Sequence, residues 1–342
     1  MTTGMSALYV GLKPGNRNYL LHRGYVQALK RAGWKTTWFS HNEGRSQDLE
    51  SFDVILWDGV IPEEQLRKLL PRQRLVLLGG IGDELAHYSR YPEAISLLTS
   101  SHCYLDEPWS NLTWQHTRWN GVRTGQVYYI AKYSRRFTRN ASPSTWEALG
   151  IRFLYLPFAS DPELFYPTKK KKNLRWGFVG NSRGRLFLRK LMAASDEKGW
   201  SYGVHAPGPT TQIDPLDLNE FYGRLGFGVN EQHLMTFGRE LNQRSFDLGM
   251  SGLMQLTDVG DLASLTFPEW CTCYSRKLAS RKEMSAGLQL AGQMDVADPD
   301  EVHTYFRQNH SFDVRLLQIG RAAGIDFHKS GVPSRDSVAA CV

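Results

Sequence analysis

A stretch of 39 residues, 108–146, contains no acidic side chain, and it combines positive charge with aromatic rings. Basic side chains interleaved with aromatic ones could bind a phosphate backbone and stack on an unpaired base. In the alternative interpretation the rings belong to a core and the arginines form a solvated face. The residues of this stretch that could contact a nucleic acid are Trp109, Trp114, Arg118, Arg123, Lys132, Arg135 and Arg136.

Three aspartates directly follow apolar runs that are expected to be strands. Asp58 follows VILW, Asp83 follows LVLLGGIG and Asp106 follows HCYL. A carboxylate at the end of a parallel strand can act as a general base, or it can cap the helix that follows. Lys13 and Asn16 lie in the loop after the first expected strand. They are therefore expected at the same carboxyl edge of the sheet as these aspartates, which we call the acceptor rim.

The charge of the whole chain is concentrated in its first half. The 342 residues carry a formal charge of +7, and the 23 basic and 15 acidic side chains of residues 1–172 account for all of it. Polyanion binding is therefore expected of the first half. With 41% hydrophobic and 22% charged residues, the chain is too apolar to be disordered and long enough for two domains.

Neither the cysteines nor the first residues indicate export. Cys103, Cys271, Cys273 and Cys341 have neither the spacing of a zinc site nor the density of a disulfide framework. Residues 1–10 lack the basic start and apolar core of a signal peptide, and no apolar run is long enough to span a bilayer. We therefore expect a cytoplasmic protein without a membrane span.

Short apolar runs alternate with helix-compatible segments in both halves, which predicts an α/β fold with doubly wound parallel sheets. Apolar residues at helical spacing predict helices at 19–32 and 312–323. We expect one domain at residues 1–165, another at 173–310, a helix within 311–328 that crosses back to the first domain, and a tail at 329–342. The expected strands cover residues 7–10, 35–39, 52–57, 74–78, 102–105 and 126–130, and then 174–179, 201–204, 225–229 and 253–256.

Three strings of the second half form one recognisable pattern: LPFASDP at 156–162, GFVGN at 177–181 and LNQRSFDLGMSGLMQLTD at 241–258. With them the chain resembles the spore-maturation-protein-like family of GT-B glycosyltransferases, over roughly residues 150–275. The resemblance implies two Rossmann-like, doubly wound domains that face a cleft. It also implies a hexosyl- or pentosyltransferase whose co-substrate is a nucleotide-diphosphate sugar, such as a UDP-sugar. No metal is expected.

The resemblance assigns the donor site to the second domain. Arg244 would offer its planar guanidinium to the diphosphate, and Asp247, where the family usually has glutamate, would accept hydrogen bonds from the ribose hydroxyls. Gly180 and Gly252 would let the backbone approach the donor closely. Alternatively, the glycines only close turns, and Arg244 and Asp247 form a surface ion pair. The other residues expected around the donor are Asn181, Ser182, His205, Asn230, His233, Asn242 and Ser245.

In the same interpretation the first domain holds the acceptor. One of the three aspartates, with Asp83 and Asp106 preferred over Asp58, would deprotonate its hydroxyl if the enzyme inverts the anomeric carbon, and a retaining outcome stays open. The acceptor could be a hydroxymethylated base in DNA, which the enzyme would have to extrude from the duplex. Two alternatives are a cell-surface or spore glycoconjugate as acceptor, and a non-catalytic nucleic-acid-binding protein on a GT-B scaffold.

Overall fold

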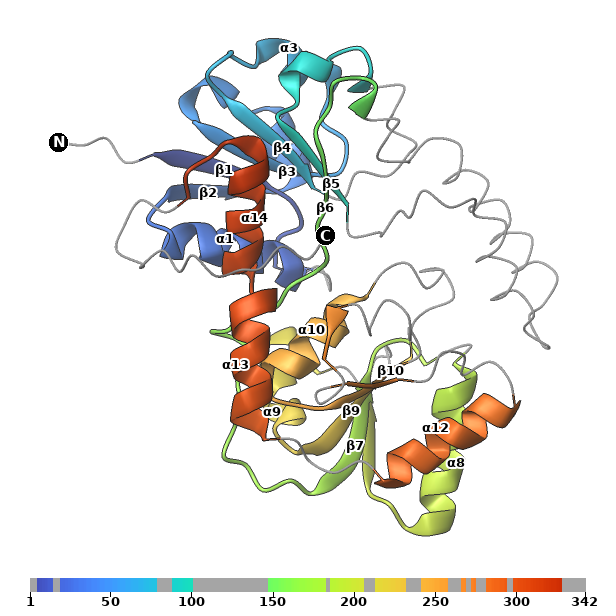
Figure 1. Ribbon diagram of the computed structural model, residues 1–342. Coiled ribbons are helices and arrows are strands. Elements are labelled where there is room, and N and C mark those ends of the chain that lie inside the picture. Colours follow the sequence, from blue (N-terminus) through green and yellow to red (C-terminus); the bar gives the residue numbers. More distant parts are fainter. Residues whose placement is uncertain are drawn as a thin grey trace. The chain divides into compact units, whose positions relative to one another are not determined.

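The computed structural model (Figure 1) describes residues 5–14, 19–78, 88–100, 147–182, 185–205, 213–231, 241–257, 266–268, 272–274, 281–293 and 298–327. The chain forms two compact units. The described residues up to Ala159 belong to the first unit, those from Ser160 to Gln308 to the second, and those from Asn309 onward return to the first. No helix among these residues is both long and apolar enough to cross a lipid bilayer.

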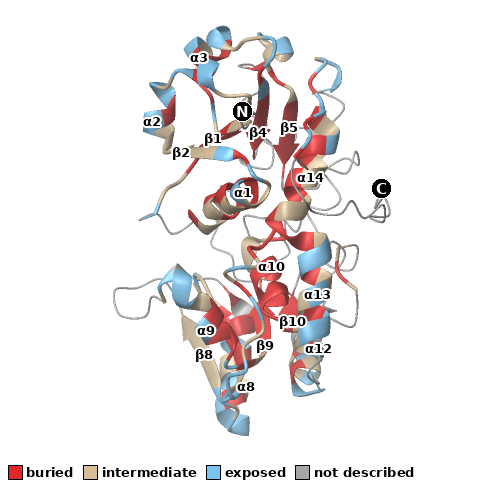
Figure 2. Cartoon of the chain, turned by 90° about the vertical axis from the view of Figure 1, so that its left-hand side faces the viewer, coloured by how far each residue is buried: buried red, intermediate tan, exposed pale blue. Residues whose placement is uncertain are grey.

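The first unit contains a parallel sheet whose described strands follow the order β2-β1-β3-β4-β5-β6. Alternate side chains of its central strands enter two different cores, Ala7 and Tyr9 the one, Leu8 and Val10 the other. Burial on both faces explains why these strands are continuous apolar runs (Figure 2). The strands are β1 (Ser6–Val10), β2 (Lys35–Phe39), β3 (Val54–Asp58), β4 (Arg74–Leu78), β5 (Leu97–Ser100) and β6 (Phe153–Tyr155).

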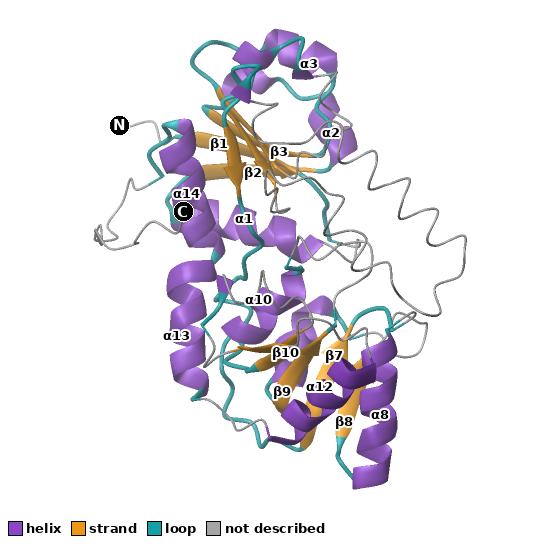
Figure 3. Cartoon of the chain, turned by 45° about the vertical axis from the view of Figure 1, so that its right-hand side comes forward, coloured by secondary structure: helices purple, strands orange, loops and turns teal. Residues whose placement is uncertain are grey.

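Helices cover both faces of this sheet (Figure 3). The helix predicted at 312–323 is present as α14, and it packs on α1, where the rings of Tyr25 and Phe312 lie 4.9 Å apart. The two helices approach so closely that a Cβ added at Gly24 would lie 2.1 Å from the Phe312 ring. The helices of this unit are α1 (Tyr19–Arg31), α2 (His41–Arg45), α3 (Glu63–Lys68) and α14 (Phe312–Ala323), with 3₁₀ turns at Leu49–Ser51 and Pro92–Ala94.

A buried arginine anchors the chain next to both passages between the units. Nε of Arg315 in α14 donates to the carbonyl of Pro157 at 2.8 Å, and Nη2 donates to that of Phe158 at 3.0 Å, just before the chain leaves the first unit. Nη1 donates to the carbonyl of Asn309 at 3.1 Å, where the chain returns. Burial lowers the pKa of Arg315 to about 10, so the guanidinium remains charged at neutral pH.

The second unit contains a parallel sheet whose described strands follow the order β11-β10-β9-β7-β8. Its core is built on Trp176, whose indole Nε1 donates to Ser195 Oγ at 2.9 Å and whose ring stacks on Tyr202. The strands are β7 (Leu174–Val179), β8 (Tyr202–His205), β9 (Leu225–Asn230), β10 (Gln255–Thr257) and β11 (Thr272–Tyr274).

Helices lie on both faces of the second sheet as well. Leu188 of α8 and Ala291 of α12 pack into the core around Trp176, whereas Leu248 of α10 reaches the other face at Gly228. The helices of this unit are α8 (Leu186–Lys198), α9 (Leu218–Tyr222), α10 (Gln243–Met250), α12 (Arg281–Gln293) and α13 (Pro299–His310, whose last two residues belong to the first unit), with a 3₁₀ turn at Pro215–Asp217.

Two parallel α/β units confirm the predicted fold class. Eight of the ten predicted strands are present as β1–β4 and β7–β10, with ends shifted by at most two residues, and the helix predicted at 19–32 is α1. The strands predicted at 102–105 and 126–130 lie outside the described residues. Three short strands, β5, β6 and β11, were not predicted.

Candidate functional site

The carboxyl edge of the second sheet brings three of the predicted donor residues together. Gly180 follows β7, Asn230 ends β9, and Arg244 lies in the first turn of α10. Nη1 of Arg244 donates to Asn230 Oδ1 at 3.1 Å, and the guanidinium lies 4.3 Å from the centroid of the Phe178 ring. A Cβ added at Gly180 would overlap Nη2 of Arg244, so alanine at this position would displace the guanidinium from where it lies.

A buried polar network fixes the start of α10, and with it Arg244. Asn242 is the N-cap, and its Oδ1 accepts a hydrogen bond from the Ser245 backbone N–H at 3.3 Å. The amide of Asn230 hydrogen-bonds to Ser245 Oγ, and Thr257 Oγ1 donates to the Asn230 carbonyl at 3.1 Å. These hydrogen bonds connect β9, β10 and α10. They make Asn230, Asn242 and Ser245 positioning residues for Arg244.

Gly180 opens the segment that leads from β7 to α8. Its φ of 137° lies in the region that favours glycine, and its backbone N–H donates to the carbonyl of His205 at 2.8 Å. The His205 ring itself packs edge-on against Phe221, 4.6 Å between centroids. Asn181, which is exposed, and Ser182, which is half-buried, follow Gly180 at the end of β7.

Asp247 lies one turn after the start of α10, and it is only 4% exposed, which excludes a surface ion pair with Arg244. Ser160 Oγ and Gln243 Nε2 both donate to its Oδ1 at 2.8 Å. Burial raises the pKa of Asp247 to about 7, although these two hydrogen bonds and the charge of Arg244 act in the opposite direction.

Two further residues of this edge were missed by sequence reasoning. The Glu231 carboxylate accepts hydrogen bonds from the backbone N–H groups of Phe187 and Leu188, 3.3 and 2.8 Å away, at the start of α8. Arg185 donates to the Glu231 carbonyl, and its guanidinium lies 5.1 Å from the Phe178 ring centroid. Two guanidinium groups thus lie against one ring beside Gly180, which makes this edge attractive to an anion. No periodicity or motif in the sequence marks Arg185 or Glu231, since a single charged residue beside a helix or a strand carries no local signal.

Gly252 lies at the opposite end of α10 from this cluster. Gly252 follows the other end of α10 with φ of 75°, and a Cβ there would lie 2.5 Å from the carbonyl oxygen of Pro299. A turn and close packing account for this glycine. His233 lies outside the described residues.

The predicted acceptor rim is described at two positions. Asp58 ends β3, where the backbone carbonyl accepts a hydrogen bond from Nε2 of His41 at 2.8 Å, and a carboxylate oxygen lies 3.6 Å from the same nitrogen. Lys13 follows β1 and pairs with Glu43 at 2.8 Å. The remaining acceptor and base candidates lie outside the described residues: Asn16, Asp83, Asp106, Trp109, Trp114, Arg118, Arg123, Lys132, Arg135 and Arg136.

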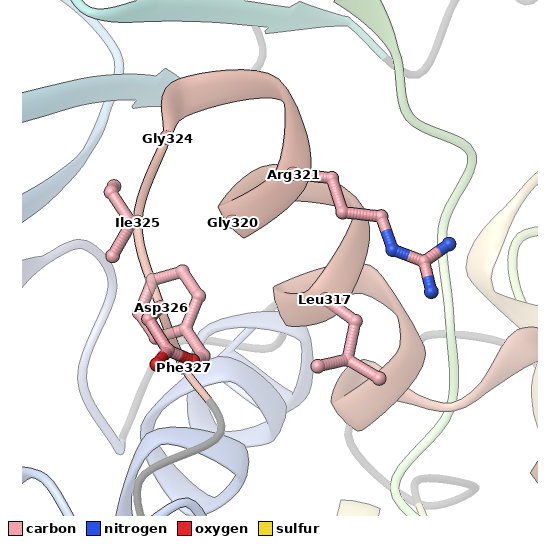
Figure 4. Close-up of a pocket in the computed structure, with 7 residues that line it drawn as sticks. All are labelled: Leu317, Gly320, Arg321, Gly324, Ile325, Asp326 and Phe327. Atoms are coloured by element: carbon pink, nitrogen blue, oxygen red, sulfur yellow. The ribbon is translucent and has the colours of Figure 1, made fainter. Parts of the chain in front are cut away.

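A pocket of about 340 Å³ is formed by the end of α14 and the segment after it (Figure 4). None of the predicted site residues lines it, so it is a separate feature of the first unit. The residues that line the pocket are Leu317, Gly320, Arg321, Gly324, Ile325, Asp326 and Phe327.

Nowhere in the described part of the chain do three His, Cys, Asp or Glu side chains gather as they would around a metal ion.

No protein-family model and no curated protein sequence matches the chain, but solved structures do. The β-glucosyltransferase of phage T4, in complex with its UDP-glucose substrate, is 10% identical, with a TM-score of 0.53, over 94% of this chain and 100% of that one. A β-glucosyltransferase described as a DNA-modifying enzyme is 11% identical, with a TM-score of 0.51, over 93% and 100%.

Sucrose-phosphate synthase from Thermosynechococcus elongatus is 12% identical, with a TM-score of 0.51, over 93% of this chain and 98% of that one. At such identities the likeness establishes the fold alone. The chain has the GT-B fold of nucleotide-sugar glycosyltransferases, as the sequence resemblance implied.

Proposed function

We propose that the chain is a glycosyltransferase that moves a sugar from a nucleotide-diphosphate sugar to a hydroxyl group. The observation that carries the proposal is the placement of the Arg244 guanidinium over Gly180 at the carboxyl edge of the second sheet. In open α/β sheets ligands bind at that edge. Because Gly180 has no side chain, a diphosphate can approach the backbone closely there. The fixed guanidinium beside it offers paired hydrogen-bond donors to the diphosphate oxygens.

The same residues suit the chemistry of transfer. When the bond between the anomeric carbon and the diphosphate breaks, negative charge grows on the leaving group, and Arg244 stabilises it because Asn230 and Phe178 hold the guanidinium in place beforehand. Both hydrogen bonds that the described residues donate to Asp247 end on Oδ1. Oδ2 is the atom that would accept from a ribose hydroxyl.

For the acceptor we propose a hydroxymethylated base in DNA. The acid-free, aromatic stretch at 108–146 supports it, since those residue types bind a phosphate backbone and stack on an extruded base. The likeness to a DNA-modifying glucosyltransferase gives independent support. A cell-surface or spore glycoconjugate is the competing acceptor, because the family resemblance does not choose between the two.

The first experiment measures the melting temperature with a panel of nucleotide sugars, because a ligand that binds only the folded state stabilises it by about 2.7 kcal/mol at a hundred times its Kd. UDP-glucose is the first probe. We expect stabilisation that is lost in Arg244→Ala combined with Asp247→Ala. Arg224→Ala is the matched control, since this exposed arginine precedes β9 at the other edge of the same sheet.

The second experiment measures sugar transfer to a duplex that contains 5-hydroxymethylcytosine, with the unmodified duplex as control. Charge reversal at Arg135 and Arg136 should weaken use of the duplex and leave the donor-induced stabilisation unchanged. Salt-sensitive DNA binding without stabilisation by any nucleotide sugar would identify a non-catalytic binding protein. Donor turnover without transfer to DNA would point to a glycoconjugate acceptor.

A further inference from the structure

A histidine and an aspartate meet at the carboxyl edge of the first sheet. His41 is the first residue of α2, and Asp58 is the last residue of β3. Because a carbonyl oxygen can only accept, the 2.8 Å contact between His41 Nε2 and the Asp58 carbonyl places a proton on Nε2. The Asp58 carboxylate oxygen lies 3.6 Å from the same nitrogen. In the neutral ring, Nδ1 therefore carries the lone pair.

The first turn of α2 is unusually well fixed for a helix of five residues. Ser40 and Glu43 form a capping box, in which the Ser40 backbone N–H donates to Glu43 Oε2 at 2.7 Å and the Glu43 N–H donates to Ser40 Oγ at 3.4 Å. Lys13 ties Glu43 to the segment after β1. The side chains of His41 and Asp58 nevertheless stay 32% and 29% exposed, so a ligand can reach them.

We propose that His41 is the general base that deprotonates the acceptor hydroxyl, with Asp58 as its positioning residue, in an inverting transfer. This assignment rests on the proposed glycosyltransferase activity. The hydroxyl proton moves to Nδ1 of His41, and the acceptor oxygen forms a bond to the anomeric carbon. The bond from that carbon to the diphosphate oxygen breaks, and its electron pair leaves with the nucleoside diphosphate. The Asp58 carboxylate then faces the imidazolium ring and stabilises its charge.

The surrounding charges suit a base that works near neutral pH. The hydrogen bonds to Asp58 raise the pKa of His41, against the opposing effects of burial and of Arg45 on the same helix. The charges of Asp58 and His41 also act on His22 of α1, whose own pKa is lowered mainly by burial. The rate of transfer should therefore fall in acid as His41 becomes protonated, with a midpoint above pH 6.5.

The decisive test compares His41→Gln, Asp58→Asn and the control Asn42→Ala, the exposed next residue of α2. UDP release from UDP-glucose is followed with the hydroxymethylcytosine duplex and with water as acceptor. His41→Gln should lower kcat by about 10²–10⁴, the usual contribution of a general base, and leave the donor KM within threefold. Asp58→Asn should move the acid limb of the pH profile to lower pH, which loss of a merely structural contact would not do.

Two results would overturn the assignment whatever the acceptor is. One is a neutral His41 that carries its proton on Nδ1, as ¹⁵N NMR of the imidazole reports directly. The other is a product of retained anomeric configuration. Transfer at the wild-type rate by His41→Gln would refute the general-base role of His41 but not the glycosyltransferase activity. Absence of both donor binding and UDP release in the wild-type protein would refute the proposed function itself.

Discussion

Replacing Asp247 by asparagine should make the protein more stable and the donor bind more weakly. The asparagine keeps the oxygen that accepts from Ser160 and Gln243, but it carries no charge. Burial raises the pKa of Asp247 from 3.8 to about 7, so at pH 8 the folded protein holds a carboxylate in a site that favours the neutral acid. A charged side chain that destabilises the folded state is typical of residues that serve binding and not stability.

The magnitude follows from the difference in proton binding. Between pH 3.8 and 7 the folded state keeps a proton on Asp247 that the unfolded state has released, so the free energy of unfolding falls as the pH rises through this window and levels off above it. At about 1.4 kcal/mol per pH unit the whole window amounts to ~4 kcal/mol. Roughly 3 kcal/mol of this falls between pH 5 and 8.

Urea unfolding at pH 5 and pH 8 measures this directly. Asp247→Asn should be more stable than the wild type at pH 8, and its advantage should shrink by roughly 3 kcal/mol at pH 5. The control is Asp217→Asn, an exposed aspartate of the same unit, which should show no such pH dependence. A variant that is less stable than the wild type at pH 8, or equally altered at both pH values, would refute the reasoning about the buried carboxyl.

Three further substitutions test the geometry. Gly180→Ala should weaken UDP-glucose binding at least tenfold in calorimetry, because its Cβ would meet Arg244 and its φ of 137° disfavours alanine; unchanged affinity would separate Gly180 from the donor site. Arg315→Met should lower the free energy of unfolding by ~3 kcal/mol or more, since it removes the hydrogen bonds that the guanidinium donates to three backbone carbonyls, and an unaltered urea midpoint would contradict that. Gly24→Ala should cost about 1–3 kcal/mol by overpacking against Phe312, and calorimetry that finds stabilisation would mean that α14 can shift freely.

The central strands could be predicted from the sequence because a strand that is buried on both faces consists of a continuous apolar run. The missed strands have only three or four residues each, and their state depends on partners far away in the chain. Phe153 of β6, for example, pairs with Leu98 of β5, 55 positions earlier. Both segments are too short to show a period, so hydrogen bonding to the neighbouring strands decides their conformation.

In the candidate sites, too, residues within one short segment could be predicted from the sequence, whereas contacts between distant segments could not. Arg244 and Asp247 could be proposed from the sequence because both lie within one short string, 241–258, that resembles a known family. His41 also had a local signal, since Ser40 and Glu43 have capping-box spacing directly after an expected strand. What no local pattern could supply is that the helix so capped would bring its first side chain to the end of β3, next to Asp58.

The three strings that carry the family resemblance form one continuous set of contacts. Ser160, in the first string, donates to Asp247, in the third, across 87 positions of sequence. Gly180, in the second string, leaves the space that Arg244 of the third string fills. The fold therefore explains why such strings occur together in one chain: each supplies a surface that another needs, and Ser160 and Gln243 hold the Asp247 carboxylate in position within this set.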